Sequence, residues 1–150
     1  MKYWLMKTEG SEYSLEDLKR DKRTAWEGVR NFQARNFMQE MREGDLILFY
    51  HSSSEVNGVY GIAKVAAIAH SDKTQFDPQS DYFEKRATKE KPVWYCVDIE
   101  FAKKFAKPVT LAELKSDPNL EGMRVRERGS RLSVQPVSES HFKRVVALGR

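Results

Sequence analysis

The chain has 150 residues, which fits one domain with a single hydrophobic core, and a net charge of +4, which is too small by itself to require a polyanionic ligand. Hydrophobic residues make up 40% of the chain, and no apolar run reaches the roughly 18 residues of a membrane span, so we expect no membrane partner. The single cysteine, Cys96, excludes an internal disulfide and, with no signal-peptide pattern at the N-terminus, predicts a cytoplasmic protein.

The first half of the chain predicts an alternation of strands and helices. Ser14 is followed three residues later by an aspartate, which is the capping box that begins a helix. Asn31 is also expected to cap a helix, because apolar residues follow it at helical spacing up to Met41, and Gly44 is expected to end that helix. The expected elements are a strand over 3–7, helices from 15 and from 32, a strand over 46–52, a turn at 56–58 and a partner strand over 59–69, with a bulge or a close backbone approach at Gly61.

The second half predicts a long loop followed by strands and helices. Residues 70–92 form a polar connection of a length that is typical of functional lids or partly mobile segments. The expected elements after it are a strand over 93–105, a helix over 110–117 with Thr110 and Glu113 as its capping box, an edge strand over 131–137 and a final helix capped by Ser138. About five strands with helices between them predict an α+β fold, a mixed curved sheet or small barrel with peripheral helices, in a single domain over residues 1–150.

Patterns for catalysis and metal binding are absent from the sequence. The three histidines, His51, His70 and His141, are far apart and have no partner at a metal-ligand spacing. No glycine-rich phosphate loop and no serine nucleophile elbow occur. We therefore expect no catalytic residue, no metal and no cofactor.

Three short groups combine aromatic, basic and hydroxyl side chains at predicted strand ends and helix starts. They lie at residues 26–31, 49–52 and 126–134. Such side chains hold a flat polar ring, because an aromatic face stacks on it, hydroxyls and amides bond its edge, and arginines bind phosphate. The three groups therefore indicate a binding site for a base of a nucleic acid.

Each residue of these groups also fits a structural role. Trp26 and Tyr50 are either core residues or walls of a ligand cage. Asn31 is a helix cap whose neighbouring amides can also meet a ligand, and His51 fits a polar rim better than a general base. Ser133 is either an ordinary strand residue or, if its edge strand opens onto a pocket, a residue whose hydroxyl hydrogen-bonds a base.

Four arginines lie between residues 124 and 131, with Glu127 as the only carboxylate among them. Arg124, Arg126 and Arg128 share one strand face if this segment is extended. A run of this kind is either a solvated surface or, together with Arg131, a set of phosphate contacts.

Five blocks of the sequence resemble the EVE-domain family. They are, in order, "YWLMKTE", "WEGVRNFQARNFM", "GDLILFYHS", "KPVWYCVDIEF" and "RGSRLSVQPVS", and they span essentially the whole chain. The resemblance implies a PUA-like fold, a twisted mixed β-barrel with peripheral helices, related to YTH and ASCH domains. One departure is that many members read Lys-Ser-Glu-Pro where this chain has Lys7-Thr8-Glu9-Gly10, so that a hydroxyl is kept at Thr8 but the loop is expected to be looser at Gly10.

The resemblance also implies a pocket for a modified base that is turned out of a nucleic acid, with 5-methylcytosine or 5-hydroxymethylcytosine as candidates in DNA. The candidate base-pocket residues are Thr8, Trp26, Arg30, Asn31, Tyr50, His51, Ser52 and Ser133, and the candidate phosphate contacts are Arg124, Arg126, Arg128 and Arg131. Stacking one base contributes about 1–3 kcal/mol and flipping it costs a few kcal/mol, so we expect modest affinity.

The leading hypothesis is therefore a module that binds DNA or RNA carrying a modified base. The alternatives are an enzyme that acts on a modified nucleotide or RNA base, and a protein-interaction domain in which residues 70–92 are the docking segment. The lack of a nucleophile with a neighbouring base in the sequence argues against the enzyme.

Overall fold

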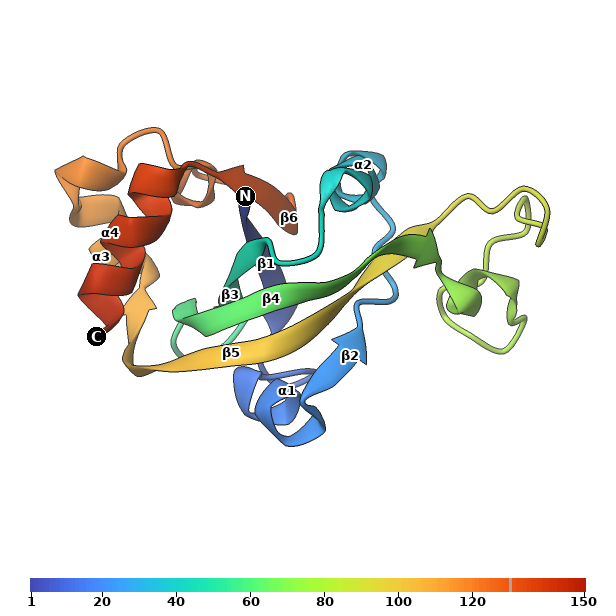
Figure 1. Ribbon diagram of the computed structural model, residues 1–150, viewed down its shortest axis with the longest axis horizontal. Coiled ribbons are helices and arrows are strands. Elements are labelled where there is room, and N and C mark those ends of the chain that lie inside the picture. The colour runs from blue at the N-terminus through green and yellow to red at the C-terminus, as the bar shows by residue number, and fades with distance from the viewer. Residues whose placement is uncertain (130) are drawn as a thin grey trace.

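The structure is a computed structural model that describes residues 1–129 and 131–150 (Figure 1). Within these residues it contains six strands, four α-helices and three short 3-10 helices. The elements are β1 (Tyr3–Glu9), α1 (Leu15–Asp21), β2 (Arg23–Ala25), α2 (Phe32–Glu40), β3 (Leu46–Ser52), β4 (Gly58–Ser71), η1 (Lys73–Phe76), β5 (Tyr95–Thr110), α3 (Leu111–Ser116), η2 (Pro118–Leu120), η3 (Arg124–Arg126), β6 (Val134–Val137) and α4 (Glu139–Gly149). None of the helices in the described residues is long and apolar enough to cross a membrane.

All six strands form one mixed sheet in the order β2-β5-β4-β3-β1-β6. The pair β1 and β3 is parallel, and the other neighbours are antiparallel. The α+β class and the mixed sheet with peripheral helices are confirmed. The ladder of hydrogen bonds does not close into a ring, because β2 and β6 each have only one neighbour among the described strands.

Helices cover both faces of the sheet, and alternate strand residues face each side. Met6 and Phe49 pack into a core with α1 and α2, whereas their neighbours Leu5 and Tyr50 pack into a second core with α3 and α4. In Figure 1 the helices α3 and α4 lie at one end of the molecule, and the segment after β4 extends beyond the other end. This alternation decides which residues of β1 and β3 face the same side as Trp26.

Local sequence signals place the helix starts as expected. The Ser14 hydroxyl accepts a hydrogen bond from the Asp17 amide at 3.1 Å, and the Asp17 carboxylate accepts one from the Ser14 amide at 2.9 Å. Asn31 caps α2, because its side-chain oxygen accepts a hydrogen bond from the Ala34 amide at 2.9 Å. The capping boxes and the Asn31 cap are thus confirmed.

Glycines occupy two positions that other residues could not adopt without strain. The helix α2 ends at Glu40, earlier than expected, and Gly44 instead occupies the following turn with a φ of 92°. Gly61 lies at a register shift between β4 and β5, where a Cβ atom would overlap the carbonyl oxygen of Lys103. The close backbone approach expected at Gly61 is confirmed.

Three segments differ from the expectations. The strand β5 runs to Thr110 rather than 105, β6 begins at Val134 rather than 131, and β2 was not expected. The strand β2 could not be predicted from a pattern, because it has only three residues and begins on a charged side chain. It pairs with a distant part of the chain, since Arg23 lies opposite Glu100, 77 residues away. Its pairing determines where Trp26 lies.

Candidate nucleic-acid interface

An open cavity of about 540 Å³ lies beside Trp26. Its walls come from the end of β1, the segment between β2 and α2, the end of β3 and the segment before β6. Thirteen residues line it: Lys7, Thr8, Glu9, Glu12, Trp26, Glu27, Gly28, Val29, Arg30, Ser52, Ser53, Arg131 and Ser133. Parallel pairing of β1 with β3, with Thr8 opposite His51 and Glu9 opposite Ser52, brings two of these walls together.

Trp26 is both a core residue and a wall of this cavity. Only 9% of its surface is exposed, and it belongs to the core that contains Phe49. Its ring meets those of Tyr13 and Phe49 at 82° and 80°, with centroids 6.1 and 5.6 Å apart. The backbone amide of Trp26 donates to the Val97 carbonyl at 2.8 Å. Trp26 is thus a core residue, and it also borders a hollow, so its role as a wall of a ligand cage stays a prediction.

Hydroxyl groups surround the cavity. Thr8 donates a hydrogen bond to the Tyr13 carbonyl at 3.0 Å, and Ser52 donates one to the Thr8 carbonyl at 3.4 Å. Ser133 is tied to β1 through its carbonyl, which accepts from the Lys7 amide at 2.8 Å. The Thr8 and Ser52 hydroxyls are thus held by backbone carbonyls, and the backbone at Ser133 is held against β1.

Charged groups of both signs border the same hollow. Burial lowers the pKa of the Lys7 ammonium below its ordinary value. Glu12 and Glu27 also line the cavity, and within the described residues no hydrogen bond or ion pair engages their carboxylates. The Glu9–Gly10 turn between these walls is not loose, because the Gly10 amide donates to the Ser54 hydroxyl at 3.2 Å.

Arg30 lines the cavity, but its guanidinium is already saturated. All five N–H groups donate, to the Val29 carbonyl, the Asp72 carboxylate, the Thr74 hydroxyl and, twice, the Tyr82 carbonyl. Its 3.1 Å ion pair with the buried Asp72 fixes the segment after β4 against the cavity. Arg30 therefore positions the wall of the cavity rather than offering a free donor to a ligand, as sequence reasoning had assumed.

Asp72 is the centre of this attachment. Its carboxylate accepts hydrogen bonds from the Gly28 amide at 2.8 Å and from the Thr74 amide at 2.9 Å, besides its ion pair with Arg30. Burial raises the pKa of Asp72, but these hydrogen bonds outweigh burial and hold the pKa below its ordinary value. The carboxylate is ionised at neutral pH and links the cavity wall at Gly28 and Arg30 to the segment after β4.

The family of the chain follows from comparison with known proteins. The family model described as the EVE domain matches residues 2–148. The chain belongs to the EVE-domain family. Human thymocyte nuclear protein 1 is 34% identical to this EVE domain over an alignment that covers 97% of this chain and 73% of that protein.

Solved structures agree with this assignment. A protein of Pseudomonas syringae matches this EVE domain with a TM-score of 0.95 and 44% identity, over 99% of each chain. Human THYN1, whose crystal structure was determined in complex with DNA containing 5-methylcytosine, matches with a TM-score of 0.93 and 34% identity, over 100% of this chain and 98% of that chain. The PUA-like architecture expected from the sequence is thereby confirmed.

Five of the eight candidate base-pocket residues line the cavity of this EVE domain, namely Thr8, Trp26, Arg30, Ser52 and Ser133. The structure places the other three elsewhere. Tyr50 is buried in the second core, on the opposite face of the sheet from Trp26. The Asn31 side chain is engaged as the cap of α2. Neither side chain lines the cavity, and Tyr50 faces away from Trp26.

His51 does not line the cavity, although its neighbours Thr8 and Ser52 do. It is buried, stacks on Tyr60 with ring centroids 3.8 Å apart, and its Nε2 accepts a hydrogen bond from the Leu15 amide at 3.1 Å. Burial lowers the pKa of His51 below its ordinary value. The imidazole thus acts as a neutral acceptor for the first turn of α1, and the expectation of a polar rim residue is wrong.

The arginine segment does not form the extended strand that was considered. Arg124 and Arg126 belong to the 3-10 helix η3, and Arg126 donates to the Lys115 carbonyl at 3.0 Å, near α3. Arg128 is exposed but does not line the cavity, whereas Arg131 does. Glycine at 129, with a φ of 74°, turns the chain between them, so only Arg131 reaches the base pocket.

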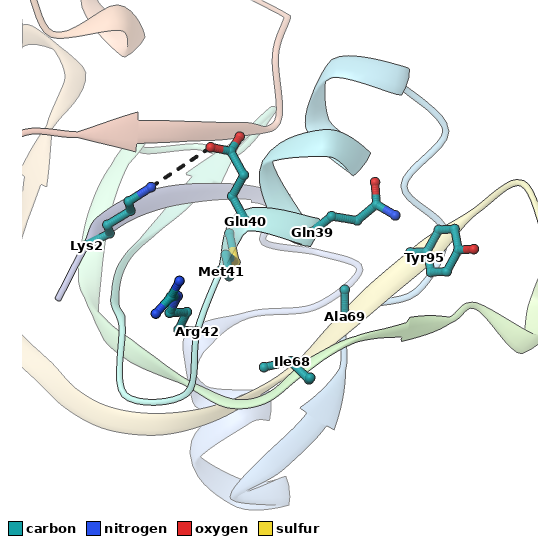
Figure 2. A pocket seen from close by; sticks show the side chains of 8 residues that line it. All are labelled: Lys2, Gln39, Glu40, Met41, Arg42, Ile68, Ala69 and Tyr95. Carbon is teal, nitrogen blue, oxygen red and sulfur yellow. Dashed lines mark ion pairs between the residues drawn. The ribbon is translucent and has the colours of Figure 1, made fainter.

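A second cavity of about 540 Å³ lies between the C-terminal end of α2 and β4. In Figure 2 its side chains are spread along an open trough, with Lys2 and Tyr95 at opposite ends. Lys2 and Glu40 neutralise each other across it, with 4.0 Å between their charged atoms. It lacks a fixed aromatic wall with converging hydroxyls, so the Trp26 cavity is the better candidate site.

A cysteine, a histidine and an aspartate lie together where β4 pairs with β5. The Cys96 sulfur is 3.8 Å from the ring nitrogens of His70, and His70 Nε2 is 2.8 Å from the Asp98 carboxylate. Cys96 is buried, and burial raises the pKa of its thiol to about 12. A thiol of this kind is not a nucleophile at neutral pH, so the arrangement does not support the enzyme hypothesis.

Proposed function

We propose that this EVE domain binds DNA that carries a 5-modified cytosine, with the modified base turned out of the helix and held against Trp26. The observation that carries the proposal is the cavity beside a fixed indole, bordered by hydroxyls and by cations. The THYN1 complex with DNA containing 5-methylcytosine supports it, because that protein has the same fold at 34% identity.

Each kind of group that lines the cavity suits a different part of the nucleotide. The indole offers a flat apolar surface for the ring and for a methyl group at its C5 position. The 4-amino group of cytosine donates hydrogen bonds, for which the carboxylates of Glu12 and Glu27 are matched acceptors. Lys7 and Arg131 are cations that line the cavity, on which the flanking phosphates would lie.

The free energies of base extrusion and stacking favour a protein that binds the modified base with modest affinity. Extruding a base costs a few kcal/mol, and stacking it on one ring returns about 1–3 kcal/mol. The net affinity must then come from the hydrogen bonds at the base edge and from the phosphates. A methyl group in an apolar site contributes about 1–3 kcal/mol, which sets the selectivity for a modified over an unmodified base.

We propose a binding rather than a catalytic role for the site. Among the described lining residues, no hydroxyl is hydrogen-bonded to a side chain that could act as its general base. RNA with the same modification is the second ligand class, because the groups named above address the base and the phosphate, which both nucleic acids share.

The decisive experiment compares matched oligonucleotides. Binding of DNA and RNA strands with cytosine, 5-methylcytosine or 5-hydroxymethylcytosine at one position is measured by fluorescence anisotropy at two salt concentrations. We expect preference for the modified DNA, and we expect Trp26→Leu, which keeps an apolar side chain but removes the stacking face, to abolish it. Retention of full preference by a folded Trp26→Leu variant would refute the pocket.

A further inference from the structure

Beside the cavity, flat side chains from α2 and from the segment 72–94 pack on one another. The Arg30 guanidinium lies 5.3 Å from the ring centroids of both Tyr82 and Trp94. Trp94 stacks on Phe32 with centroids 4.8 Å apart at 23°, and the Arg35 guanidinium lies 4.8 Å from the Phe32 ring. We call these five residues the aromatic–guanidinium cluster.

The centre of the cluster is buried and its two outer rings are exposed. Trp94 is buried, whereas Tyr82 is 42% and Phe32 is 49% exposed. Single exposed aromatic residues are ordinary on a protein surface. Here the two rings are instead parts of one packed assembly with cations beside them, so the cluster presents two partly exposed aromatic rings to solvent.

Hydrogen bonds hold these surfaces in place. Two N–H groups of Arg30 donate to the Tyr82 carbonyl at 2.7 and 3.2 Å, and the Trp94 indole donates to the Glu84 carboxylate at 3.0 Å. The Gln75 side chain also bonds the backbone of Trp94, at 2.9 Å to its amide and 2.7 Å to its carbonyl. A ligand that stacks here meets surfaces that are already ordered, which lowers the entropic cost of binding.

The cluster is continuous with the base cavity. Gly28 and Arg30 line the cavity, and the Tyr82 ring lies so close to Gly28 that a Cβ atom there would be 2.8 Å from it. Residues 85–91, which follow in the same segment, carry four cations and one carboxylate, all of them exposed. An anionic strand that leaves the cavity past Gly28 would therefore meet an aromatic ring and then positive charge.

We propose that Tyr82 and Phe32 stack the bases that flank the extruded nucleotide on the same DNA strand. This inference rests on the proposed function, because it concerns the strand that continues past Gly28 from the base held by Trp26. Flanking bases fit better than a peptide, since flat rings with adjacent phosphates match flat rings with adjacent cations. Docking of a protein partner on segment 72–94 is the competing interpretation.

The test uses a DNA ligand that lacks the flanking bases and, separately, protein variants that lack the Tyr82 or the Phe32 ring. Three DNA ligands are compared by fluorescence anisotropy: free 5-methyl-deoxycytidine monophosphate, a single strand with one central 5-methylcytosine, and the same strand with abasic sites on both sides of it. We expect the native protein to bind the intact strand about tenfold more tightly than the abasic one. Tyr82→Ala and Phe32→Ala should weaken binding of the intact strand by about the same factor and leave the monophosphate unaffected.

Two control variants sharpen the result. Tyr82→Phe keeps the ring and should bind like the native protein. Phe83 is 44% exposed in the same segment but has no described ring or cation contact, so Phe83→Ala should change little. An equal loss in Phe83→Ala, or an intact strand that binds Tyr82→Ala and Phe32→Ala as tightly as the native protein, would overturn the proposal.

The outcomes also separate this inference from the proposed function. If the native protein binds the monophosphate and loses it in Trp26→Leu, but does not distinguish intact from abasic flanks, the base pocket stands and the stacking surface is wrong. If the native protein shows no preference for the modified base in any ligand, the pocket itself is wrong. Loss of a protein partner, with DNA binding unchanged, would assign the surface to protein docking and overturn the inference.

Discussion

The indole of Trp26 is held at nearly right angles to two neighbouring rings, and this explains how a mostly buried residue can still form a binding wall. The near-perpendicular packing fixes the ring in the core while the residue still lines the cavity. A wall fixed in this way needs no rearrangement to accept a flat ligand. Its packing also means that shortening the side chain affects stability as well as binding.

Trp26→Ala should therefore be a poor test of binding. We expect it to lower the free energy of unfolding by about 3–5 kcal/mol, as truncation of a large core aromatic does. Urea unfolding followed by circular dichroism measures this directly. Trp26→Leu should lose clearly less, and equal losses in the two variants would show that the cavity rather than the core surrounds the ring.

His51 makes stability depend on pH. Burial lowers its pKa in the folded protein, and its neutral Nε2 accepts the hydrogen bond from Leu15. The unfolded chain, with a pKa near ~6.5, binds the proton more readily, so the contribution of His51 is complete above that pH and is lost as the pH falls toward the lower, folded pKa. We expect the native protein to lose stability between about pH 7 and pH 5.

The matched variant for this prediction is His51→Asn, whose side-chain oxygen can accept a hydrogen bond but does not titrate. Its free energy of unfolding should be lower than that of the native protein at pH 7 and should change less down to pH 5. Parallel pH profiles for the two proteins would contradict the assignment. Urea titrations at closely spaced pH values provide the measurement.

At the scale of single residues, the family resemblance grouped candidates that are far apart in the sequence. Trp26 was correctly placed at a ligand-sized hollow, and Thr8, Ser52 and Ser133 line it. Arg30 lines it too, but its partners Asp72 and Tyr82 lie 42 and 52 residues away, so no local pattern could reveal that its donors are occupied. Glu12 and Glu27 were missed because surface carboxylates carry no distinguishing signal.

At the scale of elements, helix caps were the most reliable signals, because they depend on side chains three residues apart. Ser14, Asn31 and Thr110 each cap a helix through the predicted bond. Tertiary pairing was not readable in the same way. The three residues of β2 are a strand only because β5 lies alongside them, and the arginines of η3 turn where an extended run was considered.

Asn31→Ala should separate the helix cap from the binding site. Loss of the bond to the Ala34 amide should lower the free energy of unfolding by about 1 kcal/mol. Binding of the monophosphate should not change, because the Asn31 side chain does not line the cavity. Thermal unfolding and anisotropy on the same preparation test both halves, and a large loss of binding without a loss of stability would restore Asn31 to the pocket.

The segment 72–94 is a folded attachment rather than a loose loop, and Asp72 secures it. Asp72→Asn removes the ion pair with Arg30 and weakens the bonds from Gly28 and Thr74. We expect Asp72→Asn to speed up amide hydrogen exchange in residues 72–94 by a larger factor than in β3. Hydrogen exchange followed by mass spectrometry measures this, and uniform acceleration across the chain would indicate global destabilisation instead.

At the scale of the whole molecule, charge placement matters more than total charge. The net charge of +4 is small, yet Lys7 and Arg131 both line the cavity, whereas Arg126 lies near α3. Electrostatic contacts from a few cations give a moderate salt dependence. The sequence alone therefore does not reveal which cations lie at the cavity.

Arg131 and Arg126 form a matched pair for this prediction. On a duplex that carries the modified base, Arg131→Gln should reduce the slope of log K against log salt by about 0.9, the value for one phosphate contact. Arg126→Gln should leave the slope unchanged, because its guanidinium is engaged with the Lys115 carbonyl at the far side. A change in the Arg126 variant alone would assign the phosphate contact to η3.

Cys96 is buried, so thiol-specific labelling reagents should not react with the native protein. It is the only cysteine in the chain, it is 1% exposed, and its thiol stays protonated at neutral pH because its pKa is about 12. Maleimide reagents should therefore leave the native protein unmodified. A cysteine introduced by Phe83→Cys would then be the one reactive thiol, and a dye placed there could report the arrival of a DNA strand at the cavity in real time.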